Sequence, residues 1–450
     1  MSRDLRTPTD RAAVPAAGGT PLGTRLRQLR MGAGLTQTEL AGSRFSKEYV
    51  SQIERGKTRP TRETIEWLAA RLGVDSGYLS DGVSADDRSR MEARVARAEA
   101  LLESEQNEEA LSELKALHGA VRALGLPEVE VRALKATARV QVRLGAVRDA
   151  IEVLQRARSL AEGPACSDVD RAELLFILGM CRYLLNSVQT AVGLFNQALT
   201  IAERSSLPSD SLQSHILSWR ARCWRRQRDL EAAREDVERA LQLAEGVEDP
   251  RTLGMAYFQA SLIADREGHW ILARNYAERA RAAFEEISDR TNVARLTNNL
   301  GALNFLLGKP EEAVEHLKEA FRIALDVGNE GDAAQAVSSL AQVHLRMGDS
   351  TLAEEQARHA LKLLEGREDF VDEYGNAQLV LGRALLEQDR LTEAEEAFRV
   401  ADASFQQLGS ASHRASAWMA RGDLASKRGE HEAAASLYRR AAEALQDVRF

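Results

Sequence analysis

Alanine and larger apolar residues recur along most of the chain with a period close to 40 residues. The recurring alanines, each 40 to 42 residues after the one before it, are Ala110, Ala150, Ala191, Ala233, Ala273, Ala313, Ala353, Ala394 and Ala434. In most copies a second alanine follows seven residues later, about two helical turns further on. A fixed period in this range indicates stacked supersecondary units. The pattern therefore predicts nine consecutive pairs of α-helices.

Three further positions keep the same phase and predict how the two helices of a pair meet. A small residue lies twelve positions before each alanine, and a larger apolar residue lies four positions after most of them. Turn residues lie five positions before the alanine in most copies, at Gly145, Asn186, Gly268, Gly308, Gly348, Asp389 and Gly429. Small residues let two helices cross closely, and a glycine ends a helix in the left-handed conformation. We expect each first helix to end at the turn residue.

The best-preserved copies resemble a known repeat family, the tetratricopeptide repeat. The residues that carry this resemblance are Leu178, Gly179, Ala191, Phe195 and Ala198, and again Leu381, Gly382, Ala394, Phe398 and Ala401. The resemblance implies an all-α protein in which residues 91–450 form a right-handed helical-repeat superhelix of about nine helix pairs. Repeats of that family run about 34 residues, so we place the additional length here in longer second helices. HEAT-type helical pairs have a compatible period and remain the alternative fold.

Residues 21–80 follow a different pattern, with short apolar stripes separated by capping residues. Thr36 precedes TQTELA with Glu39 three residues on, as in a capping box, and Ser46 opens SKEYVSQIER. The expected helices are five, at 22–31, 36–41, 46–55, 61–72 and 76–79. The run GLTQTELAGSRFSKEYVSQIERGKTRP, followed by LAARLGV, resembles the lambda-repressor-like (Cro or Xre) helix-turn-helix family. The turn between Ala41 and Ser46 is one residue shorter than is usual in that family.

This second resemblance implies that the helix from Ser46 enters the major groove of double-stranded DNA. Its candidate contacts to base edges are Lys47, Glu48, Ser51 and Gln52. The positions that meet phosphate in the family correspond to Thr36, Gln37, Tyr49, Arg55, Lys57 and Arg59, with Tyr49 equally readable as a packing residue. The family pattern also pairs Arg30 with Glu54 inside the domain. We therefore expect those two residues to be structural.

Charge divides the chain in the same way as the patterning. The whole chain carries −8, but residues 21–80 hold ten Lys/Arg and six Asp/Glu, which is +4. Residues 1–20 carry +1 and are expected to be a disordered arm, so residues 81–450 carry −13. Residues 81–90 are taken as a linker. A basic N-terminal domain on an acidic body suits DNA contact by that domain alone.

Several functional classes find no support in the sequence. No nucleotide-binding, zinc-protease or nucleophile-elbow motif is present, so we expect neither an enzyme nor a metal site or cofactor. Three cysteines with no metal spacing favour a reduced, intracellular protein. Neither a signal peptide nor a membrane-spanning run is recognisable. We therefore expect a cytoplasmic bacterial protein, nucleoid-associated when it is bound to DNA.

Polar residues at inner-face positions of the first helices predict an effector groove. Counted from the repeat alanines, these positions give Arg132, Lys135, Arg139, Trp219, Arg222, Arg295, Asn298, Asn299, Gln335, Asn376 and Arg383. Arginine binds carboxylates bidentately, and asparagine can both donate to and accept from a peptide backbone. The combination of modules resembles the peptide-pheromone-responsive regulators. Any single residue in this set could equally be a solvated or bridging side chain.

Together these features predict a sequence-specific DNA-binding transcription regulator. Its repeat domain would bind a peptide or protein effector and mediate dimerisation, because the motif usually reads two half-sites. The alternative is a protein-sequestering adaptor whose helix-turn-helix is minor or vestigial. In a third possibility, the repeats only oligomerise and no effector exists.

Overall fold

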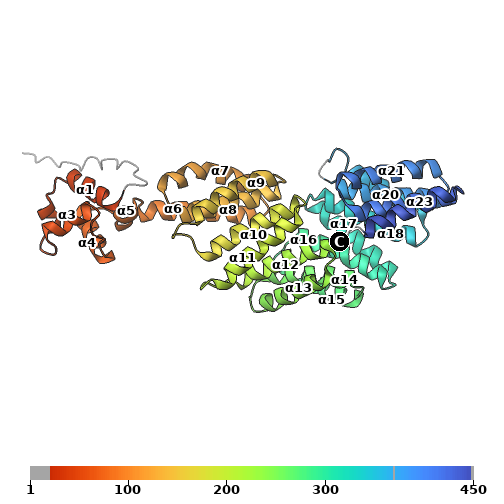
Figure 1. Ribbon diagram of the computed structural model, residues 1–450, viewed down its shortest axis with the longest axis horizontal. Coiled ribbons are helices and arrows are strands. Elements are labelled where there is room, and N and C mark those ends of the chain that lie inside the picture. The colour runs from red at the N-terminus through yellow and green to blue at the C-terminus, as the bar shows by residue number, and fades with distance from the viewer. Residues whose placement is uncertain (1–20, 368–369, 447–450) are drawn as a thin grey trace, which may run out of the picture. The chain divides into compact units, whose positions relative to one another are not determined.

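The structure, a computed structural model, describes residues 21–367 and 370–446. Every regular element in these residues is a helix, as the sequence predicts. The chain divides into two compact units, Met1–Leu207 and Pro208–Phe450, which we call unit 1 and unit 2. Figure 1 labels the helices in chain order. The expected disordered arm, residues 1–20, lies outside the described residues.

Five short helices form the N-terminal domain and confirm the expected pattern. They are α1 (Leu22–Gly32), α2 (Gln37–Ala41), α3 (Lys47–Glu54), α4 (Arg62–Leu72) and α5 (Ser76–Asp81). Leu26, Leu40, Val50, Ile53 and Leu68 are at most 1% exposed and make the centre of its core. The buried Arg25 donates from its Nε to the carbonyl of Leu79 at 3.2 Å, which joins α1 to the end of α5. A small domain of this size gains much of its stability from such complete burial.

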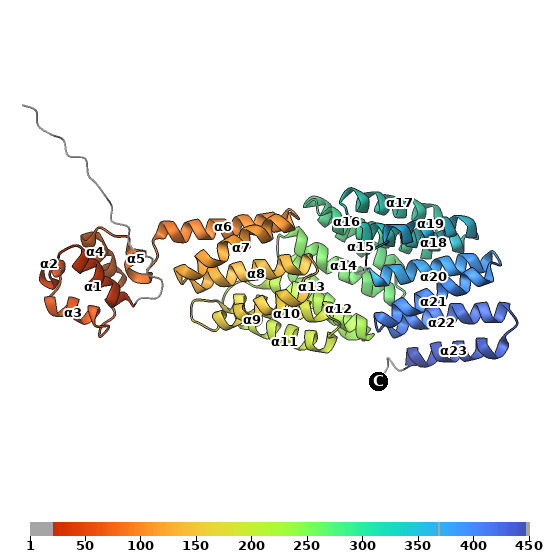
Figure 2. The same cartoon turned by 90° about the horizontal axis from the view of Figure 1, so that it is seen from above.

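Three helix pairs complete unit 1. Their helices are α6 (Ala85–Glu103), α7 (Asn107–Leu124), α8 (Pro127–Arg143), α9 (Val147–Ala161), α10 (Asp168–Leu184) and α11 (Val188–Arg204). Each contacts the next along the chain, and α8 also contacts α6 and α10 (Figure 2). The segment between α5 and α6 is only Gly82–Ser84, and Val83 packs into the core of the first pair. The expected linker 81–90 is thus mostly helical.

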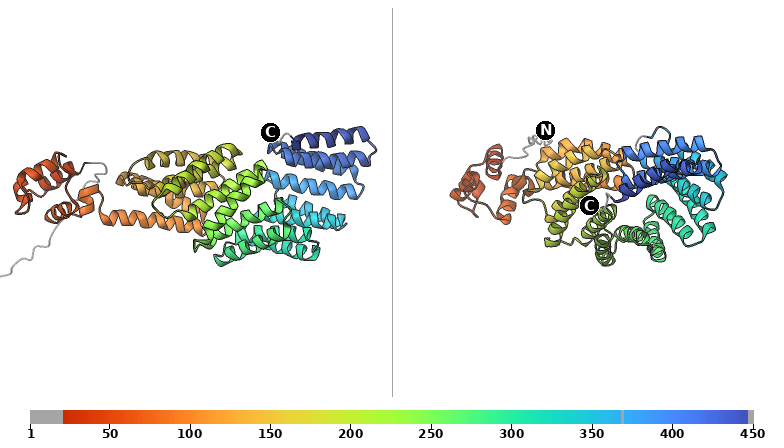
Figure 3. Two further views of the ribbon diagram at one scale, coloured as in Figure 1. Left: turned by 60° about the horizontal axis from the view of Figure 1, so that its bottom comes forward. Right: turned by 45° about the vertical axis from the view of Figure 1, so that its right-hand side comes forward.

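Six further pairs form unit 2. Their helices are α12 (Asp210–Gln227), α13 (Leu230–Glu245), α14 (Pro250–Arg266), α15 (Trp270–Glu286), α16 (Arg290–Leu306), α17 (Pro310–Asp326), α18 (Glu330–Arg346), α19 (Ser350–Leu363), α20 (Val371–Glu387), α21 (Leu391–Gln407), α22 (Ala411–Lys427) and α23 (His431–Gln446). Figure 3 gives two further views of these helices. Together with unit 1, the described residues contain the nine pairs that the period predicts.

The turn inside each pair has the backbone conformation expected from the sequence. All seven predicted turn residues have positive φ, from 62° at Asp389 to 89° at Gly348. Glu105 and Arg228 have φ of 62° and 64° at the same position of the first and fourth pairs, where the sequence has no typical turn residue. The repeat geometry therefore imposes the left-handed turn even on side chains that disfavour it.

Small residues bring the two helices of a pair together, also as expected. A Cβ atom at Gly382 in α20 would lie 2.5 Å from the ring of Phe398 in α21. Phe398 itself is 0% exposed, and the repeat alanines from Ala110 to Ala394 are likewise fully buried. The aromatic residue thus fills the space that the missing side chain leaves.

One expectation about helix length is wrong. The first helices of the pairs have 17 to 19 residues and the second helices 14 to 18. The additional length is therefore not confined to the second helices. Crossing helices gain contact only when both extend past the crossing point, which favours similar lengths.

Candidate nucleic-acid interface and effector groove

The helix α3 is amphipathic and begins at a well-formed cap. The Ser46 Oγ accepts a hydrogen bond from the Tyr49 backbone N–H at 3.1 Å. Val50 and Ile53 are buried at 0% and 1% exposure and fix the helix on α1, α2 and α4 through the shared core. The opposite edge consists of polar side chains. Because its apolar face is packed in the core, α3 presents its polar edge in a fixed orientation without a bound ligand.

The four predicted base-contact residues lie on that free edge. Lys47, Glu48 and Gln52 are exposed, and Ser51 is half-buried. Gln52 accepts a hydrogen bond at its Oε1 from the Thr58 Oγ at 3.0 Å, which holds the amide in place. Thr58 lies in the loop after α3, and we did not single it out in the sequence. The structure therefore adds a residue that positions a candidate reader.

An ion pair ties α3 to α1 and confirms an expectation from the resemblance. Glu54 accepts from the Arg30 Nε at 2.6 Å and from the Gln37 Nε2 at 2.8 Å. Burial raises the pKa of the Glu54 carboxyl, but the hydrogen bonds from Arg30 and Gln37 outweigh this effect and hold its pKa below the ordinary value. The three side chains thus connect α1, α2 and α3. Gln37 has one amide hydrogen engaged in this contact.

The remaining predicted phosphate contacts surround α3. Arg55, Lys57 and Arg59 are exposed in the segment after the helix, although the Arg55 Nε folds back to the Ser51 carbonyl at 3.1 Å. Thr36 and Glu39 form the predicted capping box, with the Thr36 backbone N–H donating to the Glu39 Oε2 at 2.7 Å. The Thr36 backbone N–H and the Glu39 backbone N–H therefore both have partners within the capping box.

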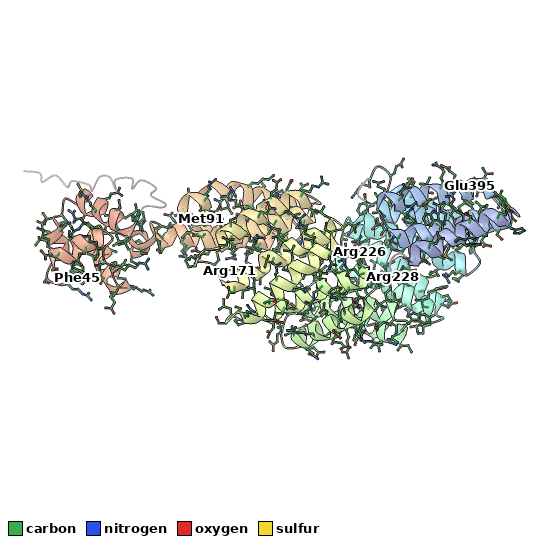
Figure 4. The ribbon with its side chains drawn as sticks, in the orientation of Figure 1. Phe45, Met91, Arg171, Arg226, Arg228 and Glu395 are labelled. Atoms are coloured by element: carbon green, nitrogen blue, oxygen red, sulfur yellow. The ribbon has the colours of Figure 1, made fainter. Side chains whose placement is uncertain are left out.

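Aromatic packing sets the turn between α2 and α3. Phe45, labelled in Figure 4, has its ring centroid 5.3 Å from Tyr49 and 5.1 Å from Trp67. The half-buried Tyr49 ring is thus part of the packing of the turn, one of the two roles considered for it. Arg44 is exposed beside Phe45, 3.9 Å from Glu63, and is a further basic side chain next to α3 that we did not predict. The sequence signal that could have identified Arg44 was its position in the turn directly before α3.

The predicted groove residues of unit 1 come together, but as members of an ion-pair network. Arg132 Nε lies 2.9 Å from Glu99 Oε1. Lys135 Nζ lies 2.7 Å from both Asp170 Oδ1 and Glu173 Oε2, and Arg139 also pairs with Glu173. The three bases and their partners line one hollow of about 440 Å³. The acids of the lining come largely from α6 and α10, and they outnumber the three bases.

The network changes the pKa values of its members in the directions that mutual pairing requires. Burial raises the pKa of Glu173, but Arg139 and Lys135 outweigh it and the net pKa is lowered. Burial likewise lowers the pKa of Lys135, but Glu173 and Asp170 outweigh it and the net pKa is raised. Lys135 and Glu173 therefore hold each other in the charged form.

In unit 2 some predicted groove residues are also paired. Arg222 stacks over the Trp219 ring at 5.1 Å, Arg295 Nε lies 2.8 Å from Asp332 Oδ2, and Asn376 Nδ2 donates to Asp372 at 3.1 Å.

Four others form a contrasting group, which we call the open set: Asn298, Asn299, Gln335 and Arg383. Each is half-buried, and none has a side-chain hydrogen bond or ion pair within the described residues. The Asn298 Oδ1 is fully buried without a partner. Burial lowers the pKa of Arg383, and nearby Asp423 only partly opposes this. The exposed parts of these side chains could contact a ligand without displacing a side-chain partner.

Among the described residues, no group of three His, Cys, Asp or Glu side chains is arranged to hold a metal ion. No helix in the described part has the length and apolarity needed to cross a bilayer.

Both the N-terminal domain and the repeats match known protein families. Residues 21–79 match the helix-turn-helix domain family, and residues 135–208, 292–366 and 338–408 match tetratricopeptide repeat families. The HTH-type transcriptional regulator DdrOP3 of Deinococcus deserti is 42% identical over 60 residues, which are 13% of this chain and 46% of that protein. The uncharacterised HTH-type transcriptional regulator y4dJ of Sinorhizobium fredii is 46% identical over 54 residues, 12% of this chain and 70% of that protein. The chain thus spans just under half of the first relative.

Solved structures resemble the repeats. A Rap protein crystallised with competence and sporulation factor has a TM-score of 0.62 at 15% identity, over 80% of this chain and 98% of that one. The apo quorum sensor NprR from B. thuringiensis has a TM-score of 0.56 at 13% identity, over 79% and 99%. At these identities the likeness shows the fold alone. The sequence matches and the fold together establish that the chain belongs to the helix-turn-helix transcriptional regulators and carries tetratricopeptide repeats after its helix-turn-helix domain.

Proposed function

We propose that this protein recognises a specific DNA sequence through α3 and regulates transcription in response to a peptide or protein bound by its repeats. The observation that best supports DNA recognition is the division of α3 into a buried apolar face and a free polar edge. Lys47 can donate to guanine acceptors, Glu48 can accept from cytosine, and Gln52 can pair with adenine. The basic charge of residues 21–80 adds attraction to phosphate, and the acidic remainder is repelled.

Selection of bound sequences from random duplex DNA tests this part directly. We expect one enriched motif, and we expect Lys47→Ala and Gln52→Ala each to cost about 1–3 kcal/mol on that motif. Lys115→Ala, which removes an exposed lysine on α7, is the matched control and leaves affinity unchanged. Arg59→Ala weakens all sequences alike and lowers the salt dependence. No enriched motif would contradict the proposal and favour the adaptor that sequesters a protein.

The effector part rests on the open set in unit 2. Asn298, Asn299 and Gln335 have amides without side-chain partners, and such amides can bind the backbone of an extended peptide. The likeness of the repeats to a Rap protein that holds competence and sporulation factor supports a ligand of this kind. Display selection with a random peptide library is the test. A binder whose affinity is lost in Asn298→Ala/Asn299→Ala supports the groove, and recovery of no binder favours repeats that only oligomerise.

The effector would act through a homodimer that places two copies of α3 at two half-sites. Recognition helices of this kind bind half-sites about 34 Å apart, so any ligand that changes the spacing of the two domains changes affinity. DNA binding with and without a selected peptide, on duplexes of varied half-site spacing, measures this coupling.

A further inference from the structure

The first turn of α15 departs from the pattern of the other second helices. Trp270, Ile271 and Leu272 are 39%, 65% and 43% exposed, and all three are large and apolar. Leu306, at the end of the next first helix α16, is 43% exposed. Exposed apolar residues that occur singly need no explanation, whereas a group of them at one place marks an interaction site.

The corresponding positions of other pairs show that this exposure is not a requirement of the fold. The two residues before the repeat alanine are Ile271 and Leu272 in α15, but Glu108 and Glu109 in α7 and Glu311 and Glu312 in α17. Each of the other pairs has at least one polar residue at these two positions. The repeat therefore accepts polar side chains there, and only the fifth pair exposes apolar ones.

The surface at this turn is also hollowed. Trp270, Ile271 and Leu272 line a hollow of about 640 Å³ together with Gly268, Asn275 and Leu307. The first turn of α15 forms one side, and Leu307, which follows α16, reaches it from the next pair (helices labelled in Figure 2). We call Trp270, Ile271, Leu272 and Leu307 the turn patch. A concave apolar surface can be buried by a matching surface with good packing.

Opposite charges lie at the turns on either side of the hollow. Arg266, the last residue of α14, is exposed in the fifth pair, and Glu311, in the first turn of α17, is exposed in the sixth. Neither has an ion pair within the described residues. A twofold axis through the patch would set the fifth pair against the sixth pair of another copy. Arg266 of each copy would then face Glu311 of the other copy. The two charged residues of this surface would therefore be complementary across a twofold contact.

We propose that the turn patch is a homodimer interface whose occupant is the same patch of a second copy of this chain. The inference rests on the proposed function, because reading two half-sites requires two N-terminal domains. That domain offers little surface for the purpose: in residues 21–80 the exposed large apolar residue is Met31 alone. An isologous contact needs one self-complementary surface, and the turn patch supplies both the apolar centre and the charged rim.

Sedimentation equilibrium of the full chain without DNA tests the interface. We expect a concentration-dependent dimer, and we expect Ile271→Glu to raise the dimer dissociation constant at least about thirtyfold, as for a central interface residue. Leu325→Glu is the matched control, because Leu325 is 43% exposed near the far end of α17 and its change leaves the dimer intact. Circular dichroism checks that both variants remain folded.

Charge reversal gives a second and independent measurement on exposed residues. Arg266→Glu and Glu311→Arg should each weaken the dimer by about threefold, and the double variant should restore it. A monomeric wild-type chain, or a dimer that is indifferent to Ile271→Glu, would overturn the proposal and leave the turn patch to a different protein. Failure of DNA recognition is separate: monomeric Ile271→Glu still binds a single half-site if α3 reads DNA, and sedimentation is measured without DNA.

Discussion

The predicted groove residues of unit 1 and the open set of unit 2 are in opposite states. In unit 1, Arg132, Lys135 and Arg139 all have carboxylate partners, and those partners come from neighbouring helices. In unit 2, Asn298, Asn299 and Arg383 have no side-chain partner within the described residues. The first arrangement joins helix pairs to one another, and the second leaves polar groups available.

This difference changes which part of the predicted effector set we expect to bind a ligand. A ligand at Lys135 must displace Asp170 and Glu173, which costs the free energy of a partly buried ion pair. A ligand at Asn299 or Gln335 instead displaces no ion pair, because neither amide has a side-chain partner within the described residues. The effector is therefore expected at α16–α20, with the unit 1 network serving stability.

The largest expected effect is the loss of stability on removing the centre of the unit 1 network. Lys135→Ala leaves Asp170 and Glu173 partly buried without their main cation, at a cost of about 2–3 kcal/mol. Hydrogen exchange should show reduced protection in α8 and α10 and unchanged protection in α16 and α18. Lys115→Ala, at an exposed site on α7, is the control and should change neither region. Equal protection in Lys135→Ala and wild type would mean that the network contributes nothing.

The sequence could predict the repeat architecture because its period is repeated nine times. Each copy independently carries the small residue, the turn residue and the buried alanine, so local errors do not accumulate. Arg228 shows the limit: its positive φ follows from its place in the repeat and not from its residue type. The helix-turn-helix was predictable in another way, because its short capping and core pattern is dense over 60 residues.

The state of the groove residues could not be predicted in the same way. The inner-face positions pointed to bases and amides, but Glu99 reaches Arg132 from α6, 33 residues earlier. Partners at that separation depend on the angle between neighbouring pairs, which no local pattern encodes. For the same reason Thr58 could not be assigned to Gln52, since the bend of the loop after α3 brings them together.

A smaller effect is expected when the unit 1 network is titrated. The net pKa values of Asp170 and Glu173 are lowered because burial, which raises them, is outweighed by Lys135 and, for Glu173, by Arg139 as well. Carboxyls with a lowered folded pKa contribute stability that is full above the unfolded value, about 4, and is lost as the pH falls through the folded value. Between pH 5 and pH 3 we therefore expect unit 1 to lose stability.

Limited digestion by pepsin, which is active in this range, measures the loss. Cleavage within α8 and α10 should begin at higher pH than cleavage within α16 and α18. In Lys135→Ala the acid-induced step in unit 1 should shrink, because the pKa values of Asp170 and Glu173 are lowered less when Lys135 is absent. Digestion of both regions at one common pH would contradict the assignment.

A gain of stability is expected from removing a charge in unit 2. Arg383 is desolvated, and Arg346 adds like-charge repulsion that Asp423 only partly offsets. Arg383→Met keeps the apolar stem and removes the charge, so we expect about 1 kcal/mol of stabilisation. Thermal unfolding and hydrogen exchange in α20 measure it. Arg358→Met on α19 is the matched control and should gain nothing, because Arg358 lies 2.8 Å from Glu354. If Arg383→Met is destabilising, the guanidinium has a structural partner and does not belong to the open set.

The sharpest test of the comparison is expected at Asn298 and Asn299. Replacing both by alanine removes a buried oxygen without a partner and introduces a better helix former, so the free energy of unfolding should not decrease. The affinity for a selected peptide should nevertheless fall at least tenfold, because two hydrogen bonds of about 0.7 kcal/mol each are lost. Asn376→Ala is the control, because that amide already donates to Asp372, and peptide affinity should stay near the wild-type value. If both variants lowered peptide affinity alike, partner status would not separate binding residues from structural ones, and the contrast between the two units would have no functional meaning.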